Sequence, residues 1–122
     1  MKVKLKRVVP YADDAMNLPV GNVDDAVPHY LNTYGFRLIT RNEAPYRSAI
    51  LERDSIRIGL AENGGDPTQE GCYFEVDDVE AAFREFKGRE PSAKDIQLDK
   101  GQRVFFDIAP DGLCFMFGQP VA

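Results

Sequence analysis

A stretch of sequence that occurs twice constrains the fold of this chain more than any other feature. Residues 20–30 and 76–86 align without a gap, at a constant offset of 56 residues. The matched positions are Val20 with Val76, Asn22 with Asp78, Val23 with Val79, Ala26 with Ala82, and Tyr30 with Phe86. Each copy has the pattern of a strand end, a helix cap and a helix with one apolar stripe. A duplicated strand–helix unit predicts two similar modules, with a ligand site where they meet.

The length allows one compact domain, so the two modules must share a core or borrow one from a second chain. The sequence has 122 residues, of which 43% are apolar and 29% charged, as in ordinary globular proteins. We expect a single domain over 1–122, divided into an N-terminal arm (1–12), a first module (13–62), a linker (63–68) and a second module (69–119). The net charge of −5 argues against partners such as nucleic acid or membranes and favours cationic ligands.

Cysteine usage and the N-terminus predict the cellular compartment. Two cysteines do not make a disulfide framework, and the chain shows no signal peptide or long apolar run. We therefore expect a cytoplasmic protein with reduced thiols. The first nine residues alternate lysine with Val3 and Leu5, which is typical of an edge strand or an arm.

Hydrophobic periodicity predicts a strand, a helix and three strands in each half, and therefore an α+β fold of two tandem βαβββ modules. The expected strands are 15–20, 36–40, 46–52, 55–61, 72–76, 96–98, 102–108 and 113–117, and the expected helices are 23–34 and 79–87. Asn22 and Asp78 are suited to cap the helices, and Gly35 and Gly88 to end them. Pro28 lies past the first turn, which predicts a kink.

Strand alternation predicts which faces lie under the helices. The expected buried sets are Met16, Leu18 and Val20; Ile56, Ile58 and Leu60; Cys72, Phe74 and Val76; Val104, Phe106 and Ile108; and Phe115 and Phe117. The opposite faces mix polar, small and aromatic residues, which suits a ligand cleft, although an exposed or dimer-facing surface is an alternative. The expected ligand-binding residues are Asn17, Tyr46, Ser48, Arg57, Tyr73, Glu75, Arg103, Phe105 and Met116. The arginines on this face could also pair with Glu75 and Asp107.

The two units resemble the vicinal oxygen chelate superfamily, which contains glyoxalases, bleomycin-resistance proteins and ring-cleaving dioxygenases. The resemblance covers about residues 13–119, and rests on the opening stretch 17–26, the start of the second unit at 73–79, and the closing hairpin at 107–112. It implies a strongly curved mixed sheet, to which each module contributes half, around a cleft. Fold alone does not assign function, because the group holds both metal enzymes and binding proteins.

The resemblance also indicates where a metal would be held. Enzymes of the superfamily use His or Glu at four cleft-facing strand positions, and these positions correspond here to Ala15, Gly59, Gly71 and Met116. None can ligate a hard or borderline divalent ion through its side chain, since the Met116 thioether prefers soft ions. We therefore expect no metal and no other cofactor. The single histidine, His29, is expected on a helix away from the cleft, as a surface or partly buried residue.

Among the metal-free members, the bleomycin-resistance proteins have the most similar sequence motifs. This resemblance implies a homodimer that sequesters a small organic ligand, such as a cationic antibiotic, between modules. No nucleophile–base pair is visible, since no histidine is placed to activate Cys114 and Cys72 is expected in the core. The lack of tryptophan leaves Tyr46, Tyr73 and Phe105 as aromatic walls. Two alternatives stay open: a glyoxalase-like lyase, isomerase or dioxygenase-type enzyme, and a structural or partner-binding module without a pocket.

Overall fold

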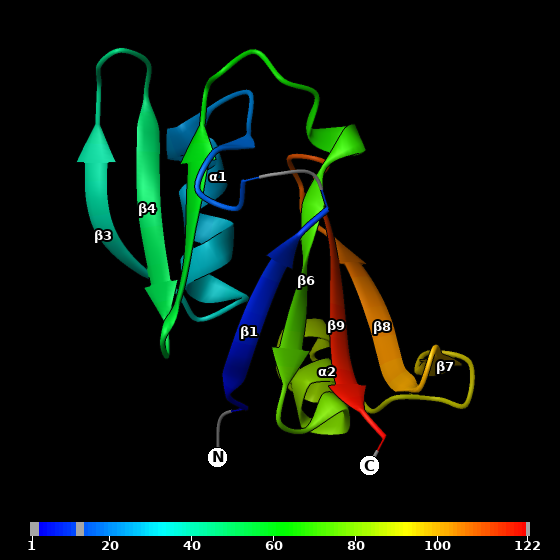
Figure 1. Ribbon diagram of the computed structural model, residues 1–122. Coiled ribbons are helices and arrows are strands. Elements are labelled where there is room, and N and C mark those ends of the chain that lie inside the picture. Colours follow the sequence, from blue (N-terminus) through cyan, green and yellow to red (C-terminus); the bar gives the residue numbers. More distant parts are fainter. Residues whose placement is uncertain (1–2, 12–13, 122) are drawn as a thin grey trace.

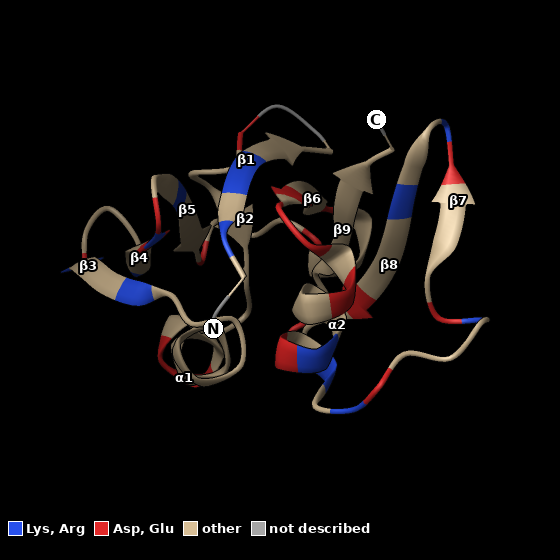
Figure 2. Ribbon diagram, turned by 90° about the horizontal axis from the view of Figure 1, so that it is seen from below, with Lys and Arg blue, Asp and Glu red and all other residues tan. Residues whose placement is uncertain are grey.

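The strands form two sheets, and both helices lie on the same side of them (Figures 1 and 2). The computed structural model describes residues 3–11 and 14–121. The first unit comprises β2 (Leu18–Pro19), α1 (Val23–Asn32), β3 (Arg37–Asn42), β4 (Ser48–Arg53) and β5 (Ile56–Ala61). The second comprises β6 (Gly71–Val76), α2 (Val79–Lys87), β7 (Gln97–Asp99), β8 (Gln102–Ile108) and β9 (Cys114–Pro120). Strand β1 (Leu5–Pro10) precedes both units, and a 3₁₀ turn (Pro67–Gln69) lies between them.

The two units have one topology, as the repeat predicts. The first sheet has the order β2-β5-β4-β3, and the second has β6-β9-β8-β7 with β1 added at its β6 edge. In both, the first strand runs parallel to the last, and the other pairs are antiparallel. The N-terminal arm therefore pairs with β6 of its own chain, and Val3 and Leu5 are buried.

Local sequence explains where the helices begin and end. The Asn22 side chain accepts a hydrogen bond from the Asp25 amide at 3.0 Å, and the Asp78 carboxylate accepts from the amides of Glu80 and Ala81, each at 3.1 Å. Gly88 ends α2 with a φ of 73°, a left-handed conformation that suits glycine. Helix α1 continues through Pro28 to Asn32. No helix in the described ranges is long and apolar enough to cross a membrane.

The strand predicted at 15–20 is reduced to Leu18–Pro19. The Asp14 carboxylate accepts hydrogen bonds from the Met16 amide at 2.8 Å and from the Asn17 side-chain nitrogen at 2.6 Å. Because this local pairing folds the backbone into a turn, Met16 is exposed rather than buried with Leu18 and Val20. The prediction of a buried Met16 is therefore wrong.

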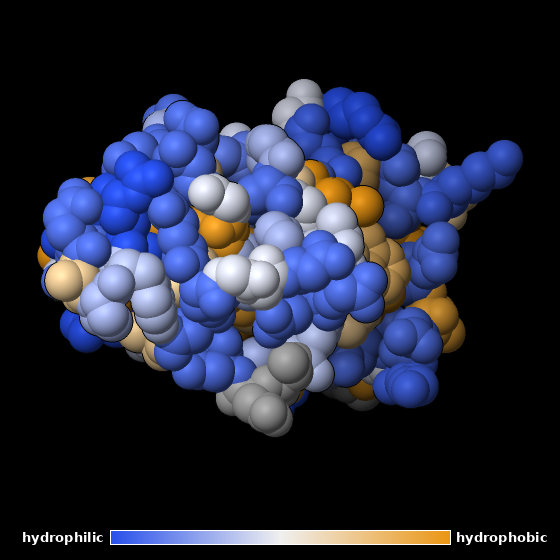
Figure 3. All heavy atoms as spheres, turned by 90° about the horizontal axis from the view of Figure 1, so that it is seen from above, coloured by the Kyte–Doolittle hydropathy of each residue, from blue (hydrophilic) through white to orange (hydrophobic). Residues whose placement is uncertain are grey.

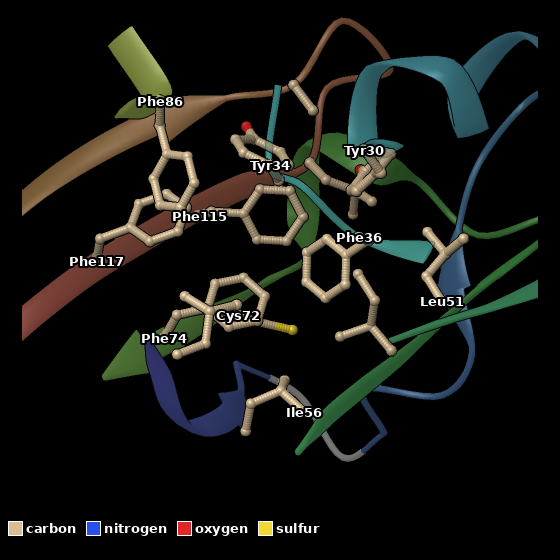
Figure 4. Packing of buried hydrophobic residues seen from close by; sticks show 14 of the residues in the cluster. Tyr30, Tyr34, Phe36, Leu51, Ile56, Cys72, Phe74, Phe86, Phe115 and Phe117 are labelled. Carbon is tan, nitrogen blue, oxygen red and sulfur yellow. The ribbon is translucent and has the colours of Figure 1, made fainter. Parts of the chain in front are cut away.

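One core joins the two units beneath the helices (Figure 4). The rings of Tyr30 and Tyr34, from α1 and the segment after it, pack edge-on against Phe115 of β9. In the other direction, Arg53 of the first unit pairs with Glu85 of α2 at 2.6 Å. Because side chains cross in both directions, the two units bury one continuous cluster, as the length of the chain requires.

Candidate functional site

The sheet faces turned away from the helices form two open surfaces, which we call the first and second open face. The first carries Ser48, Ile50 and Glu52 of β4 and Arg57, Gly59 and Ala61 of β5. The Asp14–Asn17 turn covers part of this face, because the Gly59 amide donates to the Ala15 carbonyl at 2.8 Å. At its edge, the Tyr46 hydroxyl donates to the Asn17 side-chain oxygen at 3.4 Å.

Charge dominates the uncovered part of the first open face. Arg57 donates to Glu52 at 2.8 Å, and Arg37 pairs with the other carboxylate oxygen of Glu52. The hydrogen bond from Arg57, followed by the positive charges of both arginines, lowers the pKa of Glu52 below its usual value. Arg57 therefore forms an ion pair, as the alternative to ligand binding anticipates. Its partner is Glu52 of the neighbouring strand, and not Glu75 or Asp107.

The second open face is more apolar. Its strands contribute Arg7 and Val9 from β1, Tyr73 and Glu75 from β6, Met116 and Gly118 from β9, and Gln102, Val104, Phe106 and Ile108 from β8. Phe106 is 51% exposed and Ile108 is 67% exposed, while Val9 and Tyr11 add further apolar surface on the β1 side. Exposed side chains of this size gathered on one face are typical of an interaction surface.

A few polar groups interrupt this apolar surface. The Arg7 guanidinium lies 5.8 Å from the centre of the Tyr73 ring and 3.4 Å from the Glu75 carboxylate. The Tyr73 hydroxyl donates to the side-chain oxygen of Gln102. Burial, followed by the nearby Glu75 charge, raises the pKa of Tyr73, so this phenol remains protonated and can act as a hydrogen-bond donor.

Strand β8 has the opposite orientation to the predicted one. Phe105 pairs with Phe117 across the β8–β9 ladder, and residues directly opposite each other in a ladder share a face. The two rings stack with centroids 5.0 Å apart, and Phe105 also packs on Phe83 of α2 and is 1% exposed. The assignment of Phe105 to the cleft is therefore wrong, as is the burial of Phe106 and Ile108.

Arg103 and Asp107 lie on the same face of β8 as Phe105, which is the face toward the helices. Arg103 pairs with Glu80 of α2 at 3.5 Å, and Asp107 accepts hydrogen bonds from Tyr34 and Lys87. Because the side-chain period of a strand is two, a single misplaced residue reverses the whole strand. The register of β8 on β9, which places Phe105 opposite Phe117, sets the observed orientation.

The structure separates the nine predicted ligand-binding residues into three groups. Asn17, Tyr46, Ser48 and Arg57 lie on or beside the first open face, Tyr73, Glu75 and Met116 on the second, and Arg103 and Phe105 on the helix side. Prediction from sequence missed Arg7, Gln102, Val104, Phe106 and Ile108 on the second open face.

The residues at the four expected metal positions do not fit a divalent ion. They lie in two pairs, with Ala15 beside Gly59 on the first sheet and Gly71 near Met116 on the second. A Cβ added to Gly59 would overlap the carbonyl of Met16, and one added to Gly71 would overlap the carbonyl of Cys114. Within residues 3–11 and 14–121, no three His, Cys, Asp or Glu side chains are grouped as metal ligands. Backbone thus occupies the space that ligating side chains would need.

The two cysteines differ in environment. Cys72 is buried on the core face of β6, and burial raises the pKa of its thiol to about 12. Cys114 lies on the neighbouring β9 opposite Gly71, which the Tyr11 ring covers. Since a thiolate is the reactive form, the buried Cys72 is inert.

Comparison with known proteins identifies the fold. No protein-family model and no curated protein matches the sequence. Among solved structures, TnmS3, an antibiotic-binding protein from Streptomyces sp. CB03234, is 19% identical with a TM-score of 0.70, over 89% of this chain and 96% of that one. The bleomycin resistance determinant encoded on transposon Tn5 is 24% identical with a TM-score of 0.69, over 89% and 98% of the two chains.

A third solved structure that matches this chain is named as a member of the superfamily. A member of the glyoxalase/bleomycin resistance protein/dioxygenase superfamily from Sphaerobacter thermophilus DSM 20745 is 21% identical, with a TM-score of 0.65 over 88% of this chain and 96% of that one. The chain therefore has the fold of the vicinal oxygen chelate superfamily, and the predicted α+β architecture is confirmed.

Proposed function

We propose that this protein binds a small organic molecule on its open sheet faces, without a metal or other cofactor and without catalysing a reaction. The observation that carries the proposal is the second open face, where Phe106 and Ile108 are exposed beside the partly shielded polar groups Tyr73 and Glu75. Ligand sites typically combine such apolar area with a few polar groups that fix orientation.

Charge favours a cationic, antibiotic-like ligand. Glu52 lies on the first open face and Glu75 on the second, and the chain has a net charge of −5. Among the described residues, Arg7 at 3.4 Å is the one ion-pair partner of Glu75, so a ligand cation can compete for its carboxylate. The antibiotic-binding protein TnmS3 and the Tn5 bleomycin resistance determinant share the fold, which supports this choice of ligand class.

The proposal includes a homodimer in the cytoplasm. A ligand bound on one open sheet face would have one side against the sheet and the other side exposed to water. Small-molecule sites, by contrast, typically bury 70–90% or more of a drug-sized ligand. A second copy laid across the exposed Phe106 and Ile108 would close the site. The arm could keep its pairing with β6 in either chain, because exchange preserves every contact. The free thiols of Cys72 and Cys114 support a reducing compartment.

The test uses cationic antibiotics, bleomycin among them, in a thermal-shift screen followed by calorimetry. We expect Phe106→Ala and Tyr73→Ala each to weaken binding by about 1–3 kcal/mol. Leu98→Ala is the matched control, because Leu98 is 73% exposed and pairs with Arg103 on the helix side.

Equal loss of affinity in the control would exclude a site on the open face. Turnover of a bound compound would favour the enzyme alternative, and the lack of any binder would favour a structural or partner-binding module. Light scattering on the unliganded protein tests the dimer separately, and a monomer at micromolar concentration would contradict it.

A further inference from the structure

A cavity lies on the helix side of the molecule, and none of its lining residues belongs to either open face. Its volume is about 410 Å³, and it opens where α1, the segment between the units and the β8–β9 hairpin meet. The lining residues are Gly21, Asn22, Asp25, Ala26, His29, Gly65, Pro67, Pro110 and Asp111. Figure 3 looks onto this end of the molecule, where apolar surface is visible between hydrophilic side chains. We call this space the helix-side cavity.

The two units each supply one wall. Asn22, Asp25, Ala26 and His29 are spaced as one stripe along α1, so that a single face of the helix lines the cavity. Pro110 and Asp111 belong to the β8–β9 hairpin, which is held against the 3₁₀ turn because Gly112 lies beside Thr68 and Pro67. The cavity is thus a product of how the units pack, and neither unit contains it alone.

The charge of the lining is negative. Asp25 and Asp111 are its charged side chains, and no lysine or arginine lines it. Asp111 is fixed in place, because its carboxylate accepts hydrogen bonds from the Tyr30 hydroxyl and the Leu113 amide, each at 3.0 Å. The Asp25 carboxylate forms no ion pair within the described part of the chain, so its charge is available to a ligand.

The start of α1 does not offer an anion site. The Val23 amide already donates to Glu62 at 2.9 Å, and the Asp25 and Ala26 amides donate to the side chain and carbonyl of Asn22. These are three of the donors that would otherwise hold an anion at a helix N-terminus. With them occupied and two carboxylates nearby, the cavity favours positive charge.

His29, which also lines the cavity, has one unsatisfied polar atom. Its Nε2 atom is buried and has no hydrogen-bond partner in the described residues, while its ring packs edge-on against Tyr30 and Tyr34. An unpaired buried polar atom is costly and rare in native proteins, so a water, an ion or a ligand group is expected to satisfy it.

We propose that the helix-side cavity binds a small organic cation with an ammonium head and an aliphatic body. The head lies between the carboxylates of Asp25 and Asp111, and the body packs against Ala26, Pro67 and Pro110. This site goes beyond the proposed function, because it shares no lining residue with the open faces. Occupation would join the two units through a ligand that contacts both.

The test exploits the single histidine of the chain. In proton NMR at about pH 7.5, where an imidazole is largely neutral, the His29 ring signals are followed while butylammonium, butanol or butyrate is added. We expect butylammonium to shift these signals saturably, with butanol and butyrate at least about five-fold weaker, because only the ammonium pairs with the carboxylates.

A matched pair of variants locates the site. Asp25→Asn removes a lining carboxylate, whereas Asp24→Asn removes the neighbouring carboxylate, which pairs with Arg41 and Arg47 and does not line the cavity. We expect Asp25→Asn to weaken butylammonium binding about two- to five-fold and Asp24→Asn to leave it unchanged. Equal shifts from all three probes, a preference for butyrate, equal effects of the two variants, or no shift at all would each overturn the proposal. None of these outcomes bears on antibiotic binding at the open faces.

Discussion

The two βαβββ units share a topology but fill equivalent ladder positions with side chains of very different size. In the first sheet, Leu18 pairs with Leu60 and Leu60 with Ala49. In the second, Phe74 pairs with Phe117 and Phe117 with Phe105. The larger rings of the second sheet fill the centre of the shared core, where Tyr34 crosses over to meet Phe117. Duplication has therefore kept the backbone plan while the two halves have become unequal contributors to one core.

A similar divergence is visible on the helices. His29 on α1 and Glu85 on α2 occupy equivalent positions of the repeat. Glu85 pairs with Arg53 and accepts from the Val3 amide, so it ties the arm and the first unit to α2. His29 instead lines the helix-side cavity, and its buried Nε2 atom has no hydrogen-bond partner among the described residues. One position forms a structural ion pair, whereas its equivalent lines a cavity.

The largest effect is expected from removing a ring of the second ladder. Phe105→Ala should lower the free energy of unfolding by about 3–5 kcal/mol, because it leaves a cavity between Phe117 and α2. Phe106→Ala, one residue away, should cost less than about 1 kcal/mol, since its ring is half exposed. Urea denaturation measures both, and equal losses would contradict the orientation of β8.

The next largest loss of stability is expected at Gly59 and Gly71, two of the positions where a metal ligand was expected. The comparison tests whether backbone atoms fill the space above both glycines. Gly59→Ala and Gly71→Ala should each destabilise the protein by about 3 kcal/mol, because the new Cβ overlaps a backbone carbonyl. Gly21→Ala is the control, since nothing lies within 4 Å of a Cβ there. Thermal unfolding compares the three. If either strand variant were as stable as wild type, the backbone would not close that position.

A smaller loss is expected from the ion pair that joins the units. Arg53→Met should cost about 2 kcal/mol, because it leaves the Glu85 carboxylate partly buried and the Val3 and Tyr34 carbonyls without a donor. Adding Glu85→Leu should recover part of that loss, since no unpaired charge then remains. A double-mutant cycle by chemical denaturation measures the coupling, and strictly additive effects would show that the pair contributes nothing.

The smallest effect is a pH dependence from His29. Burial lowers the pKa of His29 below its usual 6.5, although the charges of Asp107 and Asp111 oppose the shift. Because the folded pKa is lower than the unfolded one, protonation favours the unfolded chain, and stability falls as pH decreases from about 6.5 through the folded pKa. NMR titration of this single ring gives the midpoint directly. A midpoint above 6.5 would mean that the two carboxylates outweigh burial.

Much of the fold was predictable from the sequence because its signals are local. Helix α2 was predicted at its observed bounds, since Asp78 caps it and Gly88 ends it. Strand β8 was also predicted at residues 102–108, from its alternation and the turn that follows. Strand β2 was not, because the Asp14 side chain competes for the backbone with sheet pairing. That competition depends on a single carboxylate and leaves no periodic signal.

The sequence by itself determined the repeat, the element order and the lack of metal-ligating side chains at the expected positions. Only the tertiary structure decided which face of β8 turns outward, because alternation has two solutions and pairing with Phe117 selects one. It also decided that α1 and the β8–β9 hairpin enclose the helix-side cavity, since its walls are more than eighty residues apart in the chain. Local conformational preferences of the sequence determine where helices and strands form, whereas long-range packing determines which of their side chains meet in a site.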